Sequence, residues 1–356
     1  MPTLEPSRTP AATVALDEMI AQMVMVGFRG LTVRPDDPVA ADLSHHLGST
    51  VLFDTDVPTG SAIRNVQSPD QLANLTAELQ ALSSPPPVLV AVDQEGGNVA
   101  RLGPTHGFPA TLSEGELGRR DDLNLTCENA QTIASTLRTA GINLNLAPVV
   151  DLNVNPSNPI IGALDRSFSA DPNVVTRHAL EEIRTHHDAG ILATLKHFPG
   201  HGSSTGDSHL GFVDVTNTWS HIELEPFANI IAASQADVVM TAHIFNANLD
   251  PDFPATLSFA TIDGVLRGEL GFQGVVISDD MQMRAISDRY GFEDAIRLAV
   301  LAGVDIIAIA NNSVYEEGVA TRAMQVIRAA IDSGAISAER IEASYNRITM
   351  LKARIA

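Results

Sequence analysis

Cysteine, lysine and aromatic residues are scarce in this chain of 356 residues. The single cysteine, Cys127, excludes an intrachain disulfide framework and a metal site built from several cysteines. Lysine occurs only as Lys196 and Lys352, against twenty arginines. No run of 18 apolar residues is present, so the sequence predicts no membrane span. A hydrophobic content of 44% is that of an ordinary soluble globular protein.

Positive charge is also in short supply. A formal net charge of −21 argues against nucleic acid and against an anionic membrane surface as partners, because both need clustered lysine and arginine. The first fifteen residues lack a basic start followed by an apolar run, which predicts no signal peptide and a cytoplasmic protein. Residues 1–14 are rich in proline and threonine and are expected to form a flexible tail, followed by a single domain over 15–356.

Short aliphatic runs alternate with helical patterns along the rest of the chain. Such runs are typical of parallel strands that are buried on both faces. Helical patterns cover 68–82, 128–141 and 172–190, among others. The predicted strands are 23–28, 49–53, 87–93, 142–151, 191–198, 237–244, 274–280 and 304–310. Eight such units predict a (β/α)8 TIM barrel of the α/β class. An open doubly wound sheet is the alternative, which the lack of G-x-G-x-x-G after the first strand disfavours.

Polar residues gather where the predicted strands end. The carboxyl ends of barrel strands share one face, on which active sites are built, so these residues predict a single pocket. They are Asp93, Glu95, Asp151, Lys196, His197, His243, Asp279, Asp280, Asn311 and Asn312. Side chains alternate along a strand, so only one of Asp279 and Asp280 points to the barrel axis. Spacing alone does not say which one.

The segment "KHFPGHGSSTGDSHLG" (196–211) is the most polar part of the chain, with three histidines, four glycines and a lysine. A zinc site is disfavoured because Gly and Pro interrupt the histidines and no helical His-Glu-x-x-His spacing is present. A phosphate loop is disfavoured because G-x-x-x-x-G-K-[ST] is absent. The better interpretation is that Asp207 orients and charges His209, two residues away.

Seven segments together resemble β-N-acetylglucosaminidases of glycoside hydrolase family 3. They occur in the family's order over roughly 60–320, nearly the whole barrel, and the combination is highly specific. The segments are "VDQEGGNVARL" (92–102), "LAPVVDLN" (146–153), "LDRSF" (164–168), "KHFPGHG" (196–202), "DSH" (207–209), "MTAHI" (240–244) and "GVVISDDM" (274–281).

The resemblance assigns roles to individual residues. Asp279 matches the catalytic nucleophile, which leaves Asp280 as a structural neighbour. Asp93, Arg101, Arg166, Lys196 and His197 match residues that hold the hydroxyls of the terminal sugar, and His243 and Met283 are further pocket candidates. For Arg166, an ion pair with Asp165 or Asp151 is a structural alternative.

His209 matches the acid/base of this branch, with Asp207 as its partner. An imidazole has an unperturbed pKa of about 6.5, so its charged form can protonate a glycosidic oxygen and its neutral form can activate water. The carboxylate of Asp207 is expected to favour the charged form. This replaces one of the two carboxylates usual in sugar hydrolysis.

The resemblance implies a retaining exo-β-N-acetylglucosaminidase that needs no metal or organic cofactor. It implies muropeptide fragments of cell-wall recycling as substrates, and the chain is expected to be a monomer or a weak oligomer. The alternatives are a broad β-glucosidase, a phosphorylase and a non-catalytic sugar-binding barrel. The last would be expected to lose Asp279 or His209, and both are present. Many family β-glucosidases take their acid from a second domain, which this chain is expected to lack, and Ser203 and Ser204 depart from the family's usual loop residues.

Two local expectations concern the segment 196–211. The resemblance favours a cis peptide bond between Phe198 and Pro199, which X–Pro tolerates at a cost of about 0.5–1 kcal/mol. Four glycines bracket 200–211, and Ser203, Ser204 and Thr205 provide no apolar anchor. The loop is therefore expected to be little buried and to move, carrying His209 in and out of the pocket.

Overall fold

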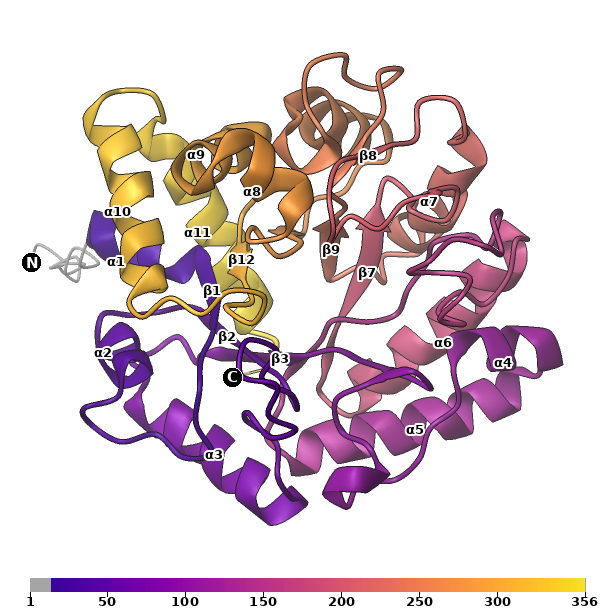
Figure 1. Ribbon diagram of the computed structural model, residues 1–356, viewed down its shortest axis with the longest axis horizontal. Helices are drawn as coiled ribbons and strands as arrows, with labels where there is room; N and C mark the ends of the chain where they lie inside the picture. The colour runs from indigo at the N-terminus through magenta and orange to yellow at the C-terminus, as the bar shows by residue number, and fades with distance from the viewer. Residues whose placement is uncertain (1–13, 356) are drawn as a thin grey trace, which may run out of the picture.

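Eight parallel strands form the centre of the molecule in a computed structural model that describes residues 14–355 (Figure 1). Neighbouring strands follow the order β11-β9-β7-β6-β3-β2-β1-β12. An isolated bridge between Ile277 and Ile306 joins β11 to β12 and closes the sheet into a barrel. The strands are β1 (Val24–Gly27), β2 (Ser49–Leu52), β3 (Leu89–Val92), β6 (Leu144–Asn145), β7 (Leu192–Phe198), β9 (Val238–Thr241), β11 (Val275–Ser278) and β12 (Ile307–Ile309). The predicted (β/α)8 barrel is confirmed.

Each of the eight predicted strands contains one observed strand, and each observed strand is shorter or starts later than predicted. The run 142–151 is reduced to the two residues of β6. Pro148, which follows Ala147 through a cis bond, has no N–H to give to a ladder, so regular pairing stops there. The chain nevertheless stays beside β7, because Val150 donates its N–H to the carbonyl of Lys196 at 2.8 Å.

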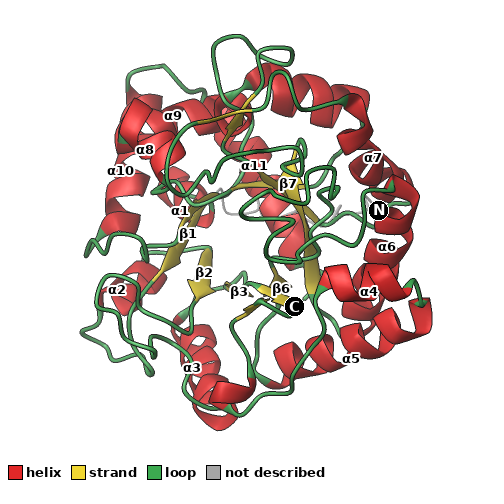
Figure 2. Cartoon of the chain, turned by 45° about the vertical axis from the view of Figure 1, so that its right-hand side comes forward, coloured by secondary structure: helices red, strands yellow, loops and turns green. Residues whose placement is uncertain are grey.

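Helices surround the barrel (Figure 2). Residues Asp122, Asp171 and Ser68 cap α5, α6 and α3 by accepting a backbone N–H with their side chains. The cap at Asp122 explains why α5 begins five residues before the predicted 128. The helices are α1 (Leu16–Gln22), α2 (Pro38–Ser44), α3 (Pro69–Leu82), α4 (Glu114–Arg120), α5 (Leu123–Thr139), α6 (Pro172–Asp188), α7 (Glu225–Ala232), α8 (Arg284–Tyr290), α9 (Phe292–Ala302), α10 (Val319–Asp332) and α11 (Ala338–Lys352).

Shorter elements lie in the loops that follow the strands. Two two-stranded ladders pair β4 (Gln94–Gly96) with β5 (Val99–Ala100) and β8 (Val213–Asp214) with β10 (Ile244–Phe245). Three 3-10 turns are η1 (Pro104–His106), η2 (His221–Leu224) and η3 (Ala255–Leu257), and η4 (Ala260–Glu269) is a π-helix that takes the place of an α-helix between β9 and β11. Long loops therefore build the face at the carboxyl ends of the strands.

Most of the predicted tail, residues 1–13, lies outside the described residues. Across 14–355, no helix is both long enough and apolar enough to pass through a bilayer.

Candidate active site

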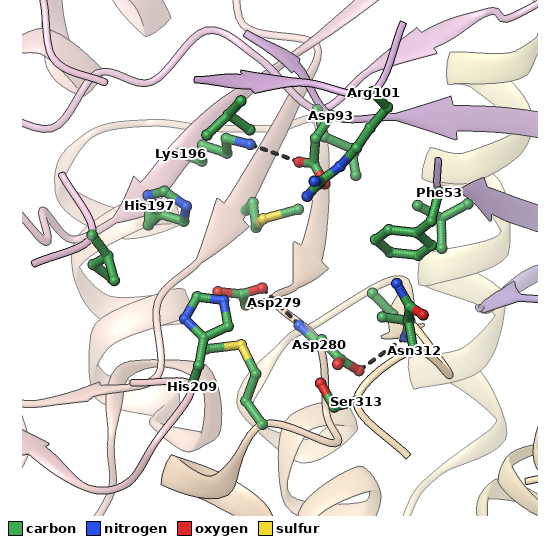
Figure 3. A pocket seen from close by; sticks show the side chains of 18 of the residues that line it. Phe53, Asp93, Arg101, Lys196, His197, His209, Asp279, Asp280, Asn312 and Ser313 are labelled. Carbon is green, nitrogen blue, oxygen red and sulfur yellow. Dashed lines mark hydrogen bonds and ion pairs between the residues drawn. The ribbon is translucent and has the colours of Figure 1, made fainter. Parts of the chain in front are cut away.

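A cavity of about 430 Å³ opens at the carboxyl ends of the strands (Figure 3). Its size lies in the usual range of small-molecule sites. Eight of the ten predicted site residues line it, namely Asp93, Arg101, Arg166, Lys196, His197, His209, Asp279 and Met283. The other two, Asp207 and His243, are not among its lining residues. The strand ends therefore meet in one pocket, as predicted.

Lys196 lies in the floor of this cavity, inside the barrel. Its Nζ is 2.9 Å from Oδ1 of Asp93 and 2.6 Å from Oε1 of Glu95. Burial alone lowers the pKa of Lys196, but the two carboxylates outweigh burial and raise that pKa above its ordinary value. Lys196 is thus a fixed ammonium donor, held in place for a polar ligand.

Glu95 is the second anchor of this cluster. Arg166 clamps it with two parallel hydrogen bonds, Nε to Oε2 at 2.8 Å and Nη2 to Oε1 at 2.7 Å. Burial raises the pKa of Glu95, but Arg166 and Lys196 bring it down to about 2. The sequence marked Glu95 only as a strand-end polar residue and assigned it no role in the site.

The alternative prediction that Arg166 forms an ion pair with Asp165 or Asp151 is wrong, because Arg166 pairs with Glu95. Asp165 contacts Arg119 at 2.5 Å instead. Asp165 has a φ of 59°, so the chain turns at this residue, and the side chains of 165 and 166 reach different partners. The carboxylate of Asp151 contacts His197 and His201, not Arg166.

His197 is oriented by Asp151, at the end of the segment after β6. The Nδ1 of His197 lies 2.6 Å from Oδ2 of Asp151, and the backbone N–H of His201 reaches Oδ1 at 2.7 Å. Burial raises the pKa of Asp151, but the attraction of His197 and His201 keeps it below its ordinary value. An ionised Asp151 accepts the Nδ1 proton, and Nε2 of His197 then lies 3.4 Å from Nη2 of Arg166 at the cavity wall. The Phe198–Pro199 bond that follows is cis, as predicted.

The two aspartates after β11 have different surroundings. Asp279 accepts only the N–H of Asp280, at 2.8 Å on Oδ1, so its second oxygen is available to the cavity (Figure 3). Asp280 accepts the N–H groups of Ala310 at 2.9 Å and Gln282 at 3.1 Å, which ties the loop after β11 to the loop after β12. This contrast supports Asp279 as the reactive carboxylate and Asp280 as a structural one.

The charge of Asp279 is supported by its neighbours. Burial raises the pKa of Asp279, but His243, His197 and His209 together hold it below its ordinary value. Burial raises the pKa of Asp280 to about 6. Near neutral pH the free carboxylate in the cavity is therefore ionised.

His209 faces Asp279 from the loop after β7 (Figure 3). Its Nδ1 is 2.7 Å from Oδ1 of Asp207, and the same oxygen accepts the backbone N–H of His209 at 2.8 Å. The His209 side chain is 55% exposed. Asp207 thus fixes Nδ1 as the donor, which leaves Nε2 free to exchange a proton with a ligand.

The loop that carries His209 is more firmly held than predicted. Ser203 and Ser204 are buried, and Trp219 Nε1 donates to the carbonyl of Pro199 at 3.0 Å. The N–H of Ser203 reaches Oε2 of buried Glu223 at 3.3 Å. The expectation of little burial is wrong for 200–204, because polar contacts hold this part without apolar anchors. Most of residues 205–212 are more exposed, although Ser208 is buried.

His243 and Met283 differ in their relation to the cavity. Both ring nitrogens of His243 are occupied, Nδ1 by Thr256 Oγ1 at 2.8 Å and Nε2 by the carbonyl of Asp280 at 3.0 Å. His243 therefore supports the strand ends around Asp279 from behind. Met283 is buried and contributes an apolar wall to the cavity.

The three histidines of 196–211 do not assemble as metal ligands. Within the part of the chain that the structure describes, no group of three or more His, Cys, Asp or Glu side chains is arranged to hold a metal ion. His197 contacts Asp151, and Nε2 of His201 lies 3.2 Å from the hydroxyl of Ser208.

Taken together, the cavity holds Asp279 with a free carboxylate oxygen, His209 opposite it and a cluster of paired charges. Charged donors and acceptors in pairs suit a ligand with adjacent hydroxyls. A free carboxylate opposite an imidazole suits nucleophilic attack combined with proton transfer.

Comparisons with known proteins identify relatives of this chain. Beta-hexosaminidase A of Pseudoalteromonas piscicida is 34% identical over 386 residues, which cover 97% of this chain and 62% of the relative. Beta-hexosaminidase of Xylella fastidiosa (strain M23) is 42% identical over 253 residues, covering 69% of this chain and 73% of the relative.

Solved structures extend the likeness over the whole barrel. The glycoside hydrolase family 3 beta-N-acetylglucosaminidase of a Paenibacillus species superposes with a TM-score of 0.87 and 39% identity, over 96% of this chain and 63% of that one. Beta-N-acetylhexosaminidase of Beutenbergia cavernae gives 0.85 and 30%, over 96% of this chain and 100% of that one. The chain thus spans less than two thirds of the Pseudoalteromonas and Paenibacillus proteins.

The family profile described as "Glycosyl hydrolase family 3 N terminal domain" matches residues 15–351, which include every residue of the cavity. The chain belongs to glycosyl hydrolase family 3.

Proposed function

We propose that this chain is a retaining exo-β-N-acetylglucosaminidase, which releases terminal β-linked N-acetylglucosamine. One observation carries the proposal: Asp279, with a free carboxylate oxygen, and His209, oriented by Asp207, face the same cavity (Figure 3). The names of the relatives, beta-hexosaminidase and beta-N-acetylglucosaminidase, support the choice of sugar.

The terminal sugar is held by the charged cluster in the floor of the cavity. Asp93 accepts hydrogen bonds from hydroxyls, while Lys196, Arg166 and Nε2 of His197 are directed at the same space. Because these charges are already paired, no side chain has to reorganise when the sugar arrives, and binding costs little conformational entropy.

Catalysis then follows in two steps. Asp279 attacks the anomeric carbon while protonated His209 gives its Nε2 proton to the departing oxygen. The bond to the leaving group breaks and a glycosyl ester forms on Asp279. Neutral His209 next takes a proton from water, which attacks the same carbon and regenerates the Asp279 carboxylate, so the product keeps its anomeric configuration.

The alternatives are a β-glucosidase and a phosphorylase. A comparison of nitrophenol release from the β-N-acetylglucosaminide, the β-glucoside and the β-xyloside, with and without phosphate, separates them. The proposal predicts a preference of at least about tenfold for the N-acetylglucosaminide, the effect of one or two well-placed contacts. It predicts no sugar phosphate among the products. Equal rates on the glucoside, or phosphate-dependent turnover, would contradict it.

Other predictions from the resemblance stay untested proposals. They are muropeptide fragments as the source of the sugar, the cytoplasm as the site of action, and a monomer or weak oligomer as the working form.

A further inference from the structure

Exposed apolar side chains occur on four of the loops that follow the barrel strands. Val57 and Leu164 line the cavity, with 65% and 38% of their surface exposed. Val314 follows the lining residue Ser313, and Leu210 follows His209, with exposures of 62% and 68%. These four residues, here the apolar rim, come from the loops after β2, β6, β12 and β7. Four separate loops therefore each present an aliphatic side chain on the face where water enters the site.

The electrostatics of the cavity act against an anion at this mouth. Arg166 and Lys196 both contact Glu95, and Arg101 lies 3.7 Å from Asp93 and 3.8 Å from Asp54. Among the lining residues that the structure describes, every arginine and lysine thus has a carboxylate neighbour. The chain as a whole carries a formal charge of −21. A carboxylate on an incoming ligand would therefore meet no lining cation that lacks a carboxylate beside it.

The proposed reaction determines what occupies the rim. The sugar is held by the charged cluster in the floor, and its anomeric carbon must lie at Asp279. His209 protonates the oxygen of the leaving group, so the leaving group lies beyond that oxygen, on the exposed side of His209. The leaving group therefore extends from the floor toward the apolar rim.

We propose that the apolar rim is the binding site for the leaving group and selects neutral substrates whose leaving group carries an apolar chain or ring. This inference rests on the proposed function and narrows its substrate class. Transfer of one methylene from water to a fully apolar site changes binding about fourfold, and a partly exposed rim provides a fraction of that. Substrates whose apolar chain ends in a carboxylate lose this gain.

A series of alkyl β-N-acetylglucosaminides tests the inference. The methyl, butyl and octyl glycosides are compared with an octyl-length glycoside that ends in a carboxylate, all below their micelle concentrations. For the native chain, we expect kcat/KM to rise at least about tenfold from methyl to octyl, and the carboxylate to remove most of the rise. In the double variant Val57→Ser, Leu164→Ser, kcat/KM should no longer depend on alkyl chain length.

Matched controls come from exposed apolar residues on outer helices. Leu301 on α9 and Met350 on α11 are 38% and 72% exposed and lie outside the rim loops. The variants Leu301→Ser and Met350→Ser should both keep the full rise of kcat/KM with alkyl chain length. Circular dichroism and a urea midpoint verify that each variant is folded.

The possible failures are distinguishable. If kcat/KM does not rise with alkyl chain length in the native chain, or if the rise survives in the double variant, the rim is not the binding site for the leaving group. The proposed hydrolytic activity would still stand. A preference for the carboxylate-bearing glycoside also overturns the rim proposal and favours the muropeptide fragments predicted above. If no glycoside in the series is hydrolysed and the nitrophenyl N-acetylglucosaminide is also stable, the proposed function itself fails.

Discussion

The two lysines of the chain lie at opposite ends of the barrel, and both are buried. Lys196, at the carboxyl end, contacts two carboxylates, Asp93 and Glu95. Lys352, the last residue of α11, instead donates to two neutral oxygens near the amino ends of β1 and β2. These are Oε1 of Gln22 at 2.6 Å and the carbonyl of Gly48 at 2.7 Å.

The difference in partners separates their charge states. The carboxylates raise the pKa of Lys196 above its ordinary value, whereas burial lowers the pKa of Lys352 to about 7. One end of the barrel thus stabilises a permanent charge where a ligand can use it. The other end uses a lysine as a structural donor whose charge is a cost. In a (β/α)8 barrel this is the expected division between a site face and a stability face.

Replacing each lysine by methionine should give the largest effect, because only the change at Lys196 should reduce activity. Lys196→Met leaves Asp93 and Glu95 without their buried cation and removes a donor to the sugar. We expect kcat/KM to fall about 10³-fold, the upper range for loss of one partner of a buried charge pair. Lys352→Met should keep kcat/KM close to that of the native chain. Steady-state kinetics on the nitrophenyl N-acetylglucosaminide measure both. Equal losses in the two variants would contradict the comparison.

A second, smaller effect tests proton transfer at the carboxyl end. His209→Ala should slow alkyl glycosides at least about 10²-fold, because their leaving groups need a proton, and should slow activated aryl glycosides far less. Asp207→Ala should follow the same pattern more mildly, since it removes only the hydrogen bond at 2.7 Å that orients the ring. Equal losses on both classes of substrate would show that His209 is not the acid.

The third prediction concerns the pH dependence of stability at the amino end. The unfolded pKa of a lysine is about 10.4, and the folded pKa of Lys352 is lowered to about 7. Between these values the unfolded state binds more protons than the folded state, so the free energy of unfolding rises with pH through this window. The cost of the buried charge is present in full below pH 7 and is lost as the pH rises.

Urea unfolding at pH 7, 8 and 9 measures this difference against Lys352→Met, which has no such group. The stability of the native chain relative to the variant should grow by about 1 kcal/mol for each pH unit. A difference that stays constant across the three pH values would mean that Lys352 is not titrating in this window.

The smallest effect is expected from Glu223, which acts on His209 only through the loop. Glu223→Ala removes the acceptor of the Ser203 N–H at 3.3 Å and should lower kcat on alkyl glycosides severalfold with little change in KM. Glu223→Gln keeps an acceptor oxygen and should restore most of the rate. If the glutamine variant is as slow as the alanine variant, the hydrogen bond to Ser203 is not what positions the loop.

The sequence predicted the barrel well because its signals are local. Each of the eight aliphatic runs is long enough to be recognised, and Ser68 and Asp171 mark helix starts at the expected places. Strand lengths were overestimated where the chain continues beside its neighbour without a regular ladder, as after Pro148.

The site was predicted in part for the same reason. Residues at strand ends, such as Lys196 and Asp279, are visible in the sequence because the strands are. The roles of Glu95, which is the partner of Arg166, and of Glu223 were missed, since they depend on contacts between positions 71 and 20 residues apart. Burial of 200–204 also depends on such long-range contacts. Glycine and serine content does not reveal these contacts, and for that reason it wrongly predicted little burial.

The central claim is that Asp279 is the nucleophile of a retaining reaction at the carboxyl end of the barrel. A 5-fluoro glycosyl donor of N-acetylglucosamine, followed by proteolysis and mass spectrometry, tests it most directly. The account predicts one covalent label, on the side chain of Asp279, that disappears slowly in buffer without the donor. A label on Asp280, or product of inverted anomeric configuration by NMR, would contradict it.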